Sequence, residues 1–115
     1  MNSEGFHKVS FSDLPPIQCP CGTTKRAFTE LPQRTASVHY LTVKEDAETH
    51  YHKTFSEIYT ILEGEGFIEL DGQMVPVKPM DTVMIEPGTR HRAIGKLIVL
   101  NVAVPTFDPE DEHLD

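Results

Sequence analysis

From residue 35 to residue 104 the sequence alternates between short β-forming runs and turn-forming residues, and this pattern is what most constrains the fold. The runs are rich in Val, Ile, Thr, Tyr and Phe, and Gly, Pro or Asp-Gly separates them. Short strands at nearly even spacing are typical of an antiparallel sandwich or barrel. No apolar 3.6-residue repeat lasts long enough to predict a helix. The sequence therefore predicts an all-β domain with strands at 36–43, 57–62, 67–70, 74–77, 82–85, 91–94 and 97–104.

The flanking segments differ from this region in composition. Residues 1–34 contain several prolines, which cannot donate to a central ladder, so we expect an extended N-terminal arm with edge strands. Residues 105–115 form an acidic tail that we expect to be a solvated end. The predicted organisation is an arm over 1–34, a barrel over 35–104 and a tail over 105–115, and 115 residues suffice for one core.

Composition and charge argue against nucleic-acid-binding and membrane-spanning proteins. The net charge is −8, but five of the 18 acidic residues lie in the last eight positions, and the rest is nearly balanced. This distribution gives no support for nucleic-acid binding. No run of about 18 apolar residues predicts a membrane span. The first five residues show no secretory signal, so a cytoplasmic location is the default expectation.

The only two cysteines, Cys19 and Cys21, flank a single proline. Their spacing is neither the Cys-x-x-Cys of redox helices nor half of a paired zinc motif. We expect a disulfide across one residue to be strained, so two free thiols in a turn are the favoured interpretation. A second interpretation places one thiol near the barrel mouth, as a modulator or an extra ligand.

Three histidines and one glutamate form the sharpest functional pattern. His50 and His52 would point to the same side of a β-strand, because successive side chains alternate faces. Glu57 follows across a short turn, and His91 comes after the Pro87-Gly88 turn signal. Three imidazoles and one carboxylate suit a divalent first-row transition metal.

This pattern resembles two motifs of the cupin superfamily. His50-x-His52-x4-Glu57-x6-Gly64 is similar to the first motif, and Pro87-Gly88-x-x-His91 to the second. The departures at Lys44, Met80, Glu86 and Gly95 fall at turns or strand ends rather than at ligand positions. The resemblance, to small bacterial single-domain cupins, implies a double-stranded β-helix, or jelly-roll barrel. It also implies a metal held inside by His50, His52, Glu57 and His91.

Strand parity extends this interpretation. If Glu57 faces the metal, Tyr59 and Ile61 also face inward, which makes Tyr59 the weak candidate for a catalytic role. Ile58 and Leu62 then face outward, and this apolar face predicts a cover, either a homodimer or the N-terminal arm.

The remaining polar residues receive plainer interpretations. His7, His39 and His113 have no motif partner, so we expect no ligand role for them. Arg90 and Arg92 should point away from the metal. Arg26 or Arg34 could supply a positive charge for an anionic ligand.

The ligand set does not select among Fe, Mn, Ni, Zn, Co and Cu. Our first hypothesis is a dioxygenase-like oxidoreductase that acts on a small molecule. One alternative is a redox-neutral sugar isomerase, epimerase or lyase, which needs an independent base, for which Tyr59 and His39 are the inward candidates. The other is a non-catalytic cupin that binds a small ligand. The neutral imidazoles predict that metal affinity falls as pH drops through about 6.5.

Overall fold

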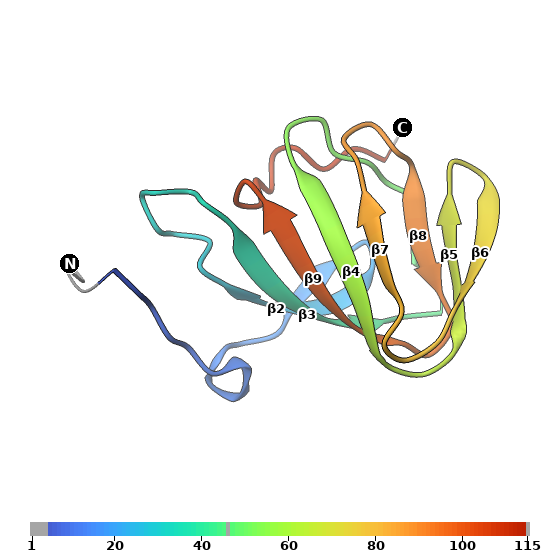
Figure 1. Cartoon of the computed structure of the whole chain (residues 1–115), viewed down its shortest axis with the longest axis horizontal. Coiled ribbons are helices and arrows are strands. Elements are labelled where there is room, and N and C mark those ends of the chain that lie inside the picture. Colours follow the sequence, from blue (N-terminus) through green and yellow to red (C-terminus); the bar gives the residue numbers. More distant parts are fainter. Residues whose placement is uncertain (1–4, 46, 115) are drawn as a thin grey trace.

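The computed structural model describes residues 5–45 and 47–114. Residues 1–4, on which the expectation about a secretory signal partly rests, and Asp115, the last residue of the predicted tail, lie outside the described residues. Two antiparallel sheets make up the domain (Figure 1). The six-stranded sheet has the order β1-β2-β3-β9-β4-β7, and the three-stranded sheet has the order β6-β5-β8. The elements are η1 (Phe11–Asp13), β1 (Ile17–Cys19), β2 (Gly22–Ala27), β3 (Ser37–Val43), β4 (Ser56–Glu63), β5 (Gly66–Leu70), β6 (Gln73–Val77), β7 (Thr82–Ile85), β8 (His91–Ile94) and β9 (Ile98–Val104).

The all-β prediction is confirmed, because the seven expected strands are β3 to β9. Only a single 3₁₀ turn, η1, adds helical structure to the described residues. None of their helices has the length and apolar character needed to cross a membrane.

The core forms between the inner faces of the two sheets. Alternate residues of β4 are buried, namely Glu57, Tyr59 and Ile61, as parity predicts. The main cluster joins side chains of both sheets, including Ile61, Ile68 and Val99. Because the same faces that carry the core also carry Glu57 and Tyr59, the site lies inside the barrel.

Gly64 closes the turn after β4 for a steric reason. Its φ is +90°, and a Cβ there would lie 2.0 Å from the backbone oxygen of Lys96. Only glycine allows both this conformation and this close approach. The motif glycine therefore holds the β4–β5 turn against the segment that leads into β9.

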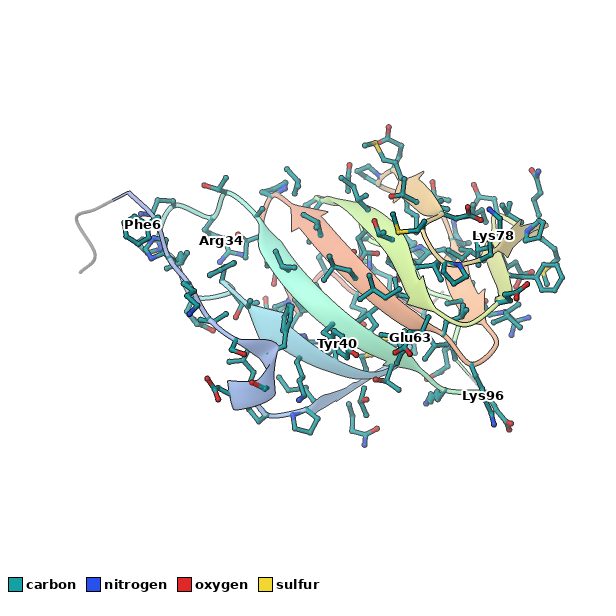
Figure 2. All side chains as sticks on the ribbon, turned by 60° about the horizontal axis from the view of Figure 1, so that its bottom comes forward. Phe6, Arg34, Tyr40, Glu63, Lys78 and Lys96 are labelled. Carbon is teal, nitrogen blue, oxygen red and sulfur yellow. A yellow bond between two sulfur atoms is a disulfide. The ribbon has the colours of Figure 1, made fainter. Side chains whose placement is uncertain are left out.

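Among the described residues, the N-terminal segment covers the outer face of the larger sheet at its β3 side. Phe11 of η1 packs against Tyr40 of β3, with ring centroids 5.7 Å apart, and Figure 2 shows Tyr40 on β3 next to the N-terminal segment. Leu62 and Met84, at the β4–β7 end, remain 41% and 61% exposed. The arm thus covers part of the face, and the homodimer stays a prediction.

Two expectations about local structure are wrong. Cys19 and Cys21 form a disulfide, because the β1–β2 hairpin turns at Pro20 and brings their Cα atoms to 5.2 Å, within the range that a disulfide spans. The residues around His50 and His52 do not form a strand. They make isolated bridges, His50 with His91 and Tyr51 with His113.

Candidate metal centre

His50, His52, Glu57 and His91 converge inside the barrel, with one ligand atom of each within 4.8 Å of all the others. All four are buried, and His91 is fully enclosed. Glu57 comes from β4 and His91 begins β8, while the bridge between His50 and His91 sets their rings 4.4 Å apart. The structure thus brings together the four residues that the sequence predicts as ligands, and such a cluster can hold a metal ion.

Backbone carbonyls fix the orientation of all three imidazole rings. The Nδ1 atoms of His50, His52 and His91 lie 3.0, 2.7 and 2.9 Å from the carbonyl oxygens of Glu48, Asp111 and Thr89. A carbonyl oxygen only accepts hydrogen bonds, so each Nδ1 carries the proton and donates it. In the neutral ring, the lone pair is therefore on Nε2.

These lone pairs face a carboxylate. Nε2 of His52 and Nε2 of His91 lie 3.2 and 2.9 Å from Oε1 of Glu57. Within the described part of the chain, these three buried atoms have no hydrogen-bond partner of suitable geometry. Acceptor atoms so close together repel one another unless a proton or a metal cation lies between them. The donor set thus fits a divalent metal on the geometry of the chain itself.

Asn101 of β9 orients the remaining ligand. Its Nδ2 atom donates to Oε2 of Glu57 at 2.6 Å, which leaves Oε1 aimed at the two imidazoles. Asn101 is 4% exposed. Sequence reasoning missed this residue, although an amide in the apolar run 97–104 was a usable signal.

Without a metal, the electrostatics of the cluster favour a protonated His52 beside an ionised Glu57. Burial would raise the pKa of Glu57, but contacts with His52 and His91 outweigh it and hold that pKa well below its usual range. Burial likewise opposes charge on His52, yet the adjacent Glu57 carboxylate raises its pKa. Burial and the charge of His91 lower the pKa of His50 to about 4. His52 therefore takes up a proton more readily than an ordinary imidazole does, and this proton competes with a metal.

The C-terminal segment is part of the site rather than a solvated end. Asp111 is 6% exposed, and its carboxylate accepts hydrogen bonds from the backbone N–H groups of Lys53 and Thr54, from the Thr54 hydroxyl and from His113. His113 also pairs with the backbone of Tyr51. The expectation of a solvated tail is wrong at Asp111, because this carboxylate fixes the tail beside the segment that carries His50 and His52.

A small cavity of about 20 Å³ adjoins the ligands. Three further proton-carrying side chains line it, namely those of His39, Tyr59 and Glu112. Burial lowers the pKa of His39 to about 4, whereas it raises the pKa of Glu112 and brings that of Tyr59 well above 10. His39 shares the buried parity of Leu41 on β3, so it lies on the inward side, as expected of a candidate base.

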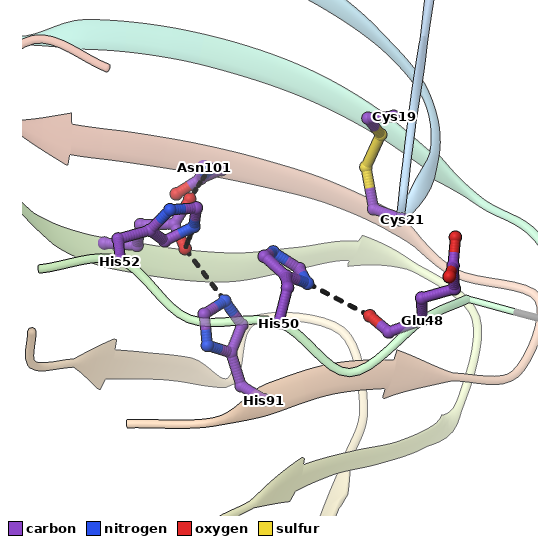
Figure 3. Close-up of a disulfide and its surroundings, with 8 residues drawn as sticks. Cys19, Cys21, Glu48, His50, His52, His91 and Asn101 are labelled. Atoms are coloured by element: carbon purple, nitrogen blue, oxygen red, sulfur yellow. Dashed lines mark hydrogen bonds and ion pairs between the residues drawn. A yellow bond between two sulfur atoms is a disulfide. The ribbon is translucent and has the colours of Figure 1, made fainter. Parts of the chain in front are cut away.

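The disulfide also lines this cavity, the region in which the second interpretation placed one thiol. Figure 3 shows it above the ring of His50 and the adjacent Glu48. As a disulfide, the pair offers no thiolate for a metal.

The arginines divide between the cavity and the surface. Arg26 lines the cavity. Arg34 donates to the carbonyl oxygens of Thr106 and Phe107 instead. Arg92 pairs with Glu69, and Arg90 lies over the Tyr51 ring, so neither lines the cavity.

Known proteins share both the motif region and the whole architecture. The Cupin domain family model matches residues 37–96. A protein of Methanocaldococcus jannaschii, MJ1618, is 41% identical over 69 residues, which are 56% of this chain and 55% of that protein, so the match spans about half of its length. A protein from Planctomyces limnophilus is 35% identical, with a TM-score of 0.88 over 97% of this chain and 99% of the other. The Streptomyces nucleoside dehydratase Pac13 shares the fold at 18% identity, with a TM-score of 0.82 over 94% of this chain and 89% of the other. By its motif spacing, its barrel and these matches, the chain belongs to the cupin family.

Proposed function

We propose that this protein is a metal-dependent enzyme that catalyses a redox-neutral proton-transfer reaction, an elimination or an isomerisation, on a small molecule. A divalent metal held by His50, His52, Glu57 and His91 would supply Lewis-acid polarisation of a substrate oxygen. The reaction then needs groups that take up and deliver protons beside that oxygen.

The observation that carries the proposal is the presence of proton-carrying groups that are not ligands. Tyr59 and Glu112 line the same cavity as the cluster. Burial raises the pKa of Glu112, which moves a carboxyl group toward the range where it exchanges protons near neutral pH. Tyr59 keeps its proton, because burial raises its pKa well above 10. We assign proton exchange to Glu112 and hydrogen-bond donation to the substrate oxygen to Tyr59.

The dioxygenase hypothesis stays a prediction that the cavity does not favour. Binding of O₂ and substrate at open metal positions does not by itself require Glu112 and Tyr59, whereas an elimination or an isomerisation does require an acid or a base beside the substrate. Pac13 is described as a dehydratase and is seen with uridine. Its likeness to this chain is one of fold, and we include nucleosides in the test for that reason.

The test incubates protein loaded with Zn, Ni, Mn or Fe(II) with nucleosides, sugars and hydroxy acids, while NMR follows the products and an electrode follows O₂. We expect turnover without O₂ uptake, and a drop of roughly 10²- to 10⁴-fold for Glu112→Gln. Glu110→Gln is the matched control, since Glu110 is an exposed carboxylate two residues away. Substrate-dependent O₂ uptake would move the assignment to a dioxygenase, and binding without turnover would indicate a non-catalytic cupin.

A further inference from the structure

Arg26 lines the cavity beside the candidate ligands, where the Glu112 carboxyl group interacts with it electrostatically without forming an ion pair. Its guanidinium makes no hydrogen bond or ion pair with any residue in 5–45 or 47–114, and its Nε is buried without a partner. Burial lowers the pKa of this group, so the charge is held at a cost. The residue as a whole is only half-buried, but a buried Nε–H donor that is left unpaired calls for an explanation outside the folded chain.

The way in which Arg26 is held explains why its donors are free. The guanidinium lies over the ring of Phe107, with its carbon 4.4 Å from the ring centroid. Stacking uses the flat face of the group and leaves its N–H donors, which lie in the plane, available at the edge. Phe107 therefore positions Arg26 without consuming its hydrogen-bonding capacity.

Arg26 lies at the boundary between two cavities. Arg26 and Phe107 line the inner cavity of about 20 Å³, and both also line an outer recess of about 220 Å³ with Pro15, Ile17, Thr29 and Glu30. The inner cavity has room for about one water molecule, so only a small reactive end of a substrate can enter it. The rest of the substrate must lie in the outer recess, past Arg26.

We propose that Arg26 binds the carboxylate or phosphate group of the substrate at this boundary, in a bidentate contact. The planar fork of donors matches the oxygen atoms of either anion. Glu30 lines the outer recess and Glu112 the inner cavity, and neither forms an ion pair with Arg26 that would occupy its donors, although the charge of Glu112 acts to raise the pKa of Arg26. The inference rests on the proposed function, which it deepens by making the substrate an oxyanion.

Binding of simple anions tests this without turnover. Inorganic phosphate and acetate are titrated separately into zinc-loaded protein and into protein treated with EDTA, and the ¹H–¹⁵N signal of the Arg26 Nε–H group is followed. We expect a saturable shift that persists without metal. Whichever anion binds more tightly identifies the preferred group.

Variants separate a binding role from a structural one. Arg26→Gln should lower the affinity for the preferred anion by roughly 10- to 100-fold, and Arg26→Lys by less, since lysine keeps the charge but loses the fork. Arg34→Gln is the control, because that guanidinium already donates to two carbonyl oxygens. Unchanged binding in Arg26→Gln, no shift in the wild-type protein, or a shift that requires the metal would overturn the inference. Each of these results leaves the acid–base proposal standing, because that proposal depends on Glu112 and Tyr59.

Discussion

Replacing Asp111 by Asn tests whether the C-terminal segment holds the metal site together. The carboxylate accepts four contacts, from the backbone of Lys53, the backbone and hydroxyl of Thr54, and the His113 ring. An asparagine side chain has one acceptor oxygen and sets an NH₂ group against the remaining donors. About two charge-assisted bonds are lost, each worth roughly 1.5–3 kcal/mol. Because water can replace part of these hydrogen bonds, we expect the free energy of unfolding of the metal-free protein to fall by about 2–4 kcal/mol.

The same change should weaken metal binding. The backbone oxygen of Asp111 accepts the proton of His52 Nδ1 at 2.7 Å, so a loosened segment no longer fixes that ring. Loss of such support typically lowers metal affinity by roughly 10- to 100-fold. The assays are urea denaturation of EDTA-treated protein and zinc competition against a chromophoric chelator.

Glu110→Gln is the matched control for Asp111→Asn, since it removes an exposed carboxylate from the same segment. It should change the free energy of unfolding by at most about 0.5 kcal/mol. If the two variants unfold at the same urea concentration and bind zinc equally well, the tail is not part of the site and our account of it fails.

Three further predictions follow from individual residues. Contact with Glu57 outweighs burial and raises the pKa of His52. Protons therefore compete with the metal for this imidazole from above pH 6.5, so zinc affinity should already decline there as pH falls. A constant zinc affinity between pH 8 and pH 6 would contradict this prediction. Gly64→Ala should destabilise the fold by about 2 kcal/mol more than Gly72→Ala, measured by thermal unfolding, because both residues have positive φ but only Gly64 would clash with a backbone oxygen. Protein that is denatured without reductant should give no free thiol in a colorimetric assay, since Cys19 and Cys21 are joined, and two thiols per chain would show that the bond is absent.

The four candidate ligands were predictable because their signal is local. His50, His52 and Glu57 lie within eight positions, at the spacing of the first cupin motif. The strands were predictable for the same reason, since turn residues mark their ends. His91 needed the second motif as well, because it reaches the cluster only through the barrel's topology.

The supporting residues could not be predicted to the same degree. Asn101 and Asp111 act on ligands 44 and 59 positions away, so their roles exist only once the sheets have formed. The acidic tail looked like a solvated segment because charge is the only local property that Asp111 and Glu112 show. The prediction of free thiols at Cys19 and Cys21 was wrong for a different reason. Their short spacing does not reveal the β1–β2 hairpin that brings the two sulfur atoms together.

Metal binding by wild-type protein and by His52→Ala is the measurement that tests the central claim most directly. Protein purified without added metal is stripped, loaded with zinc, desalted and measured by plasma mass spectrometry. We expect about one metal per wild-type chain, because four ligand atoms converge on one point. His52→Ala should lose most of this metal, while His7→Ala, outside the cluster, should keep it. A wild-type chain that retains no metal, or a His52→Ala protein that retains the full amount, would contradict the account.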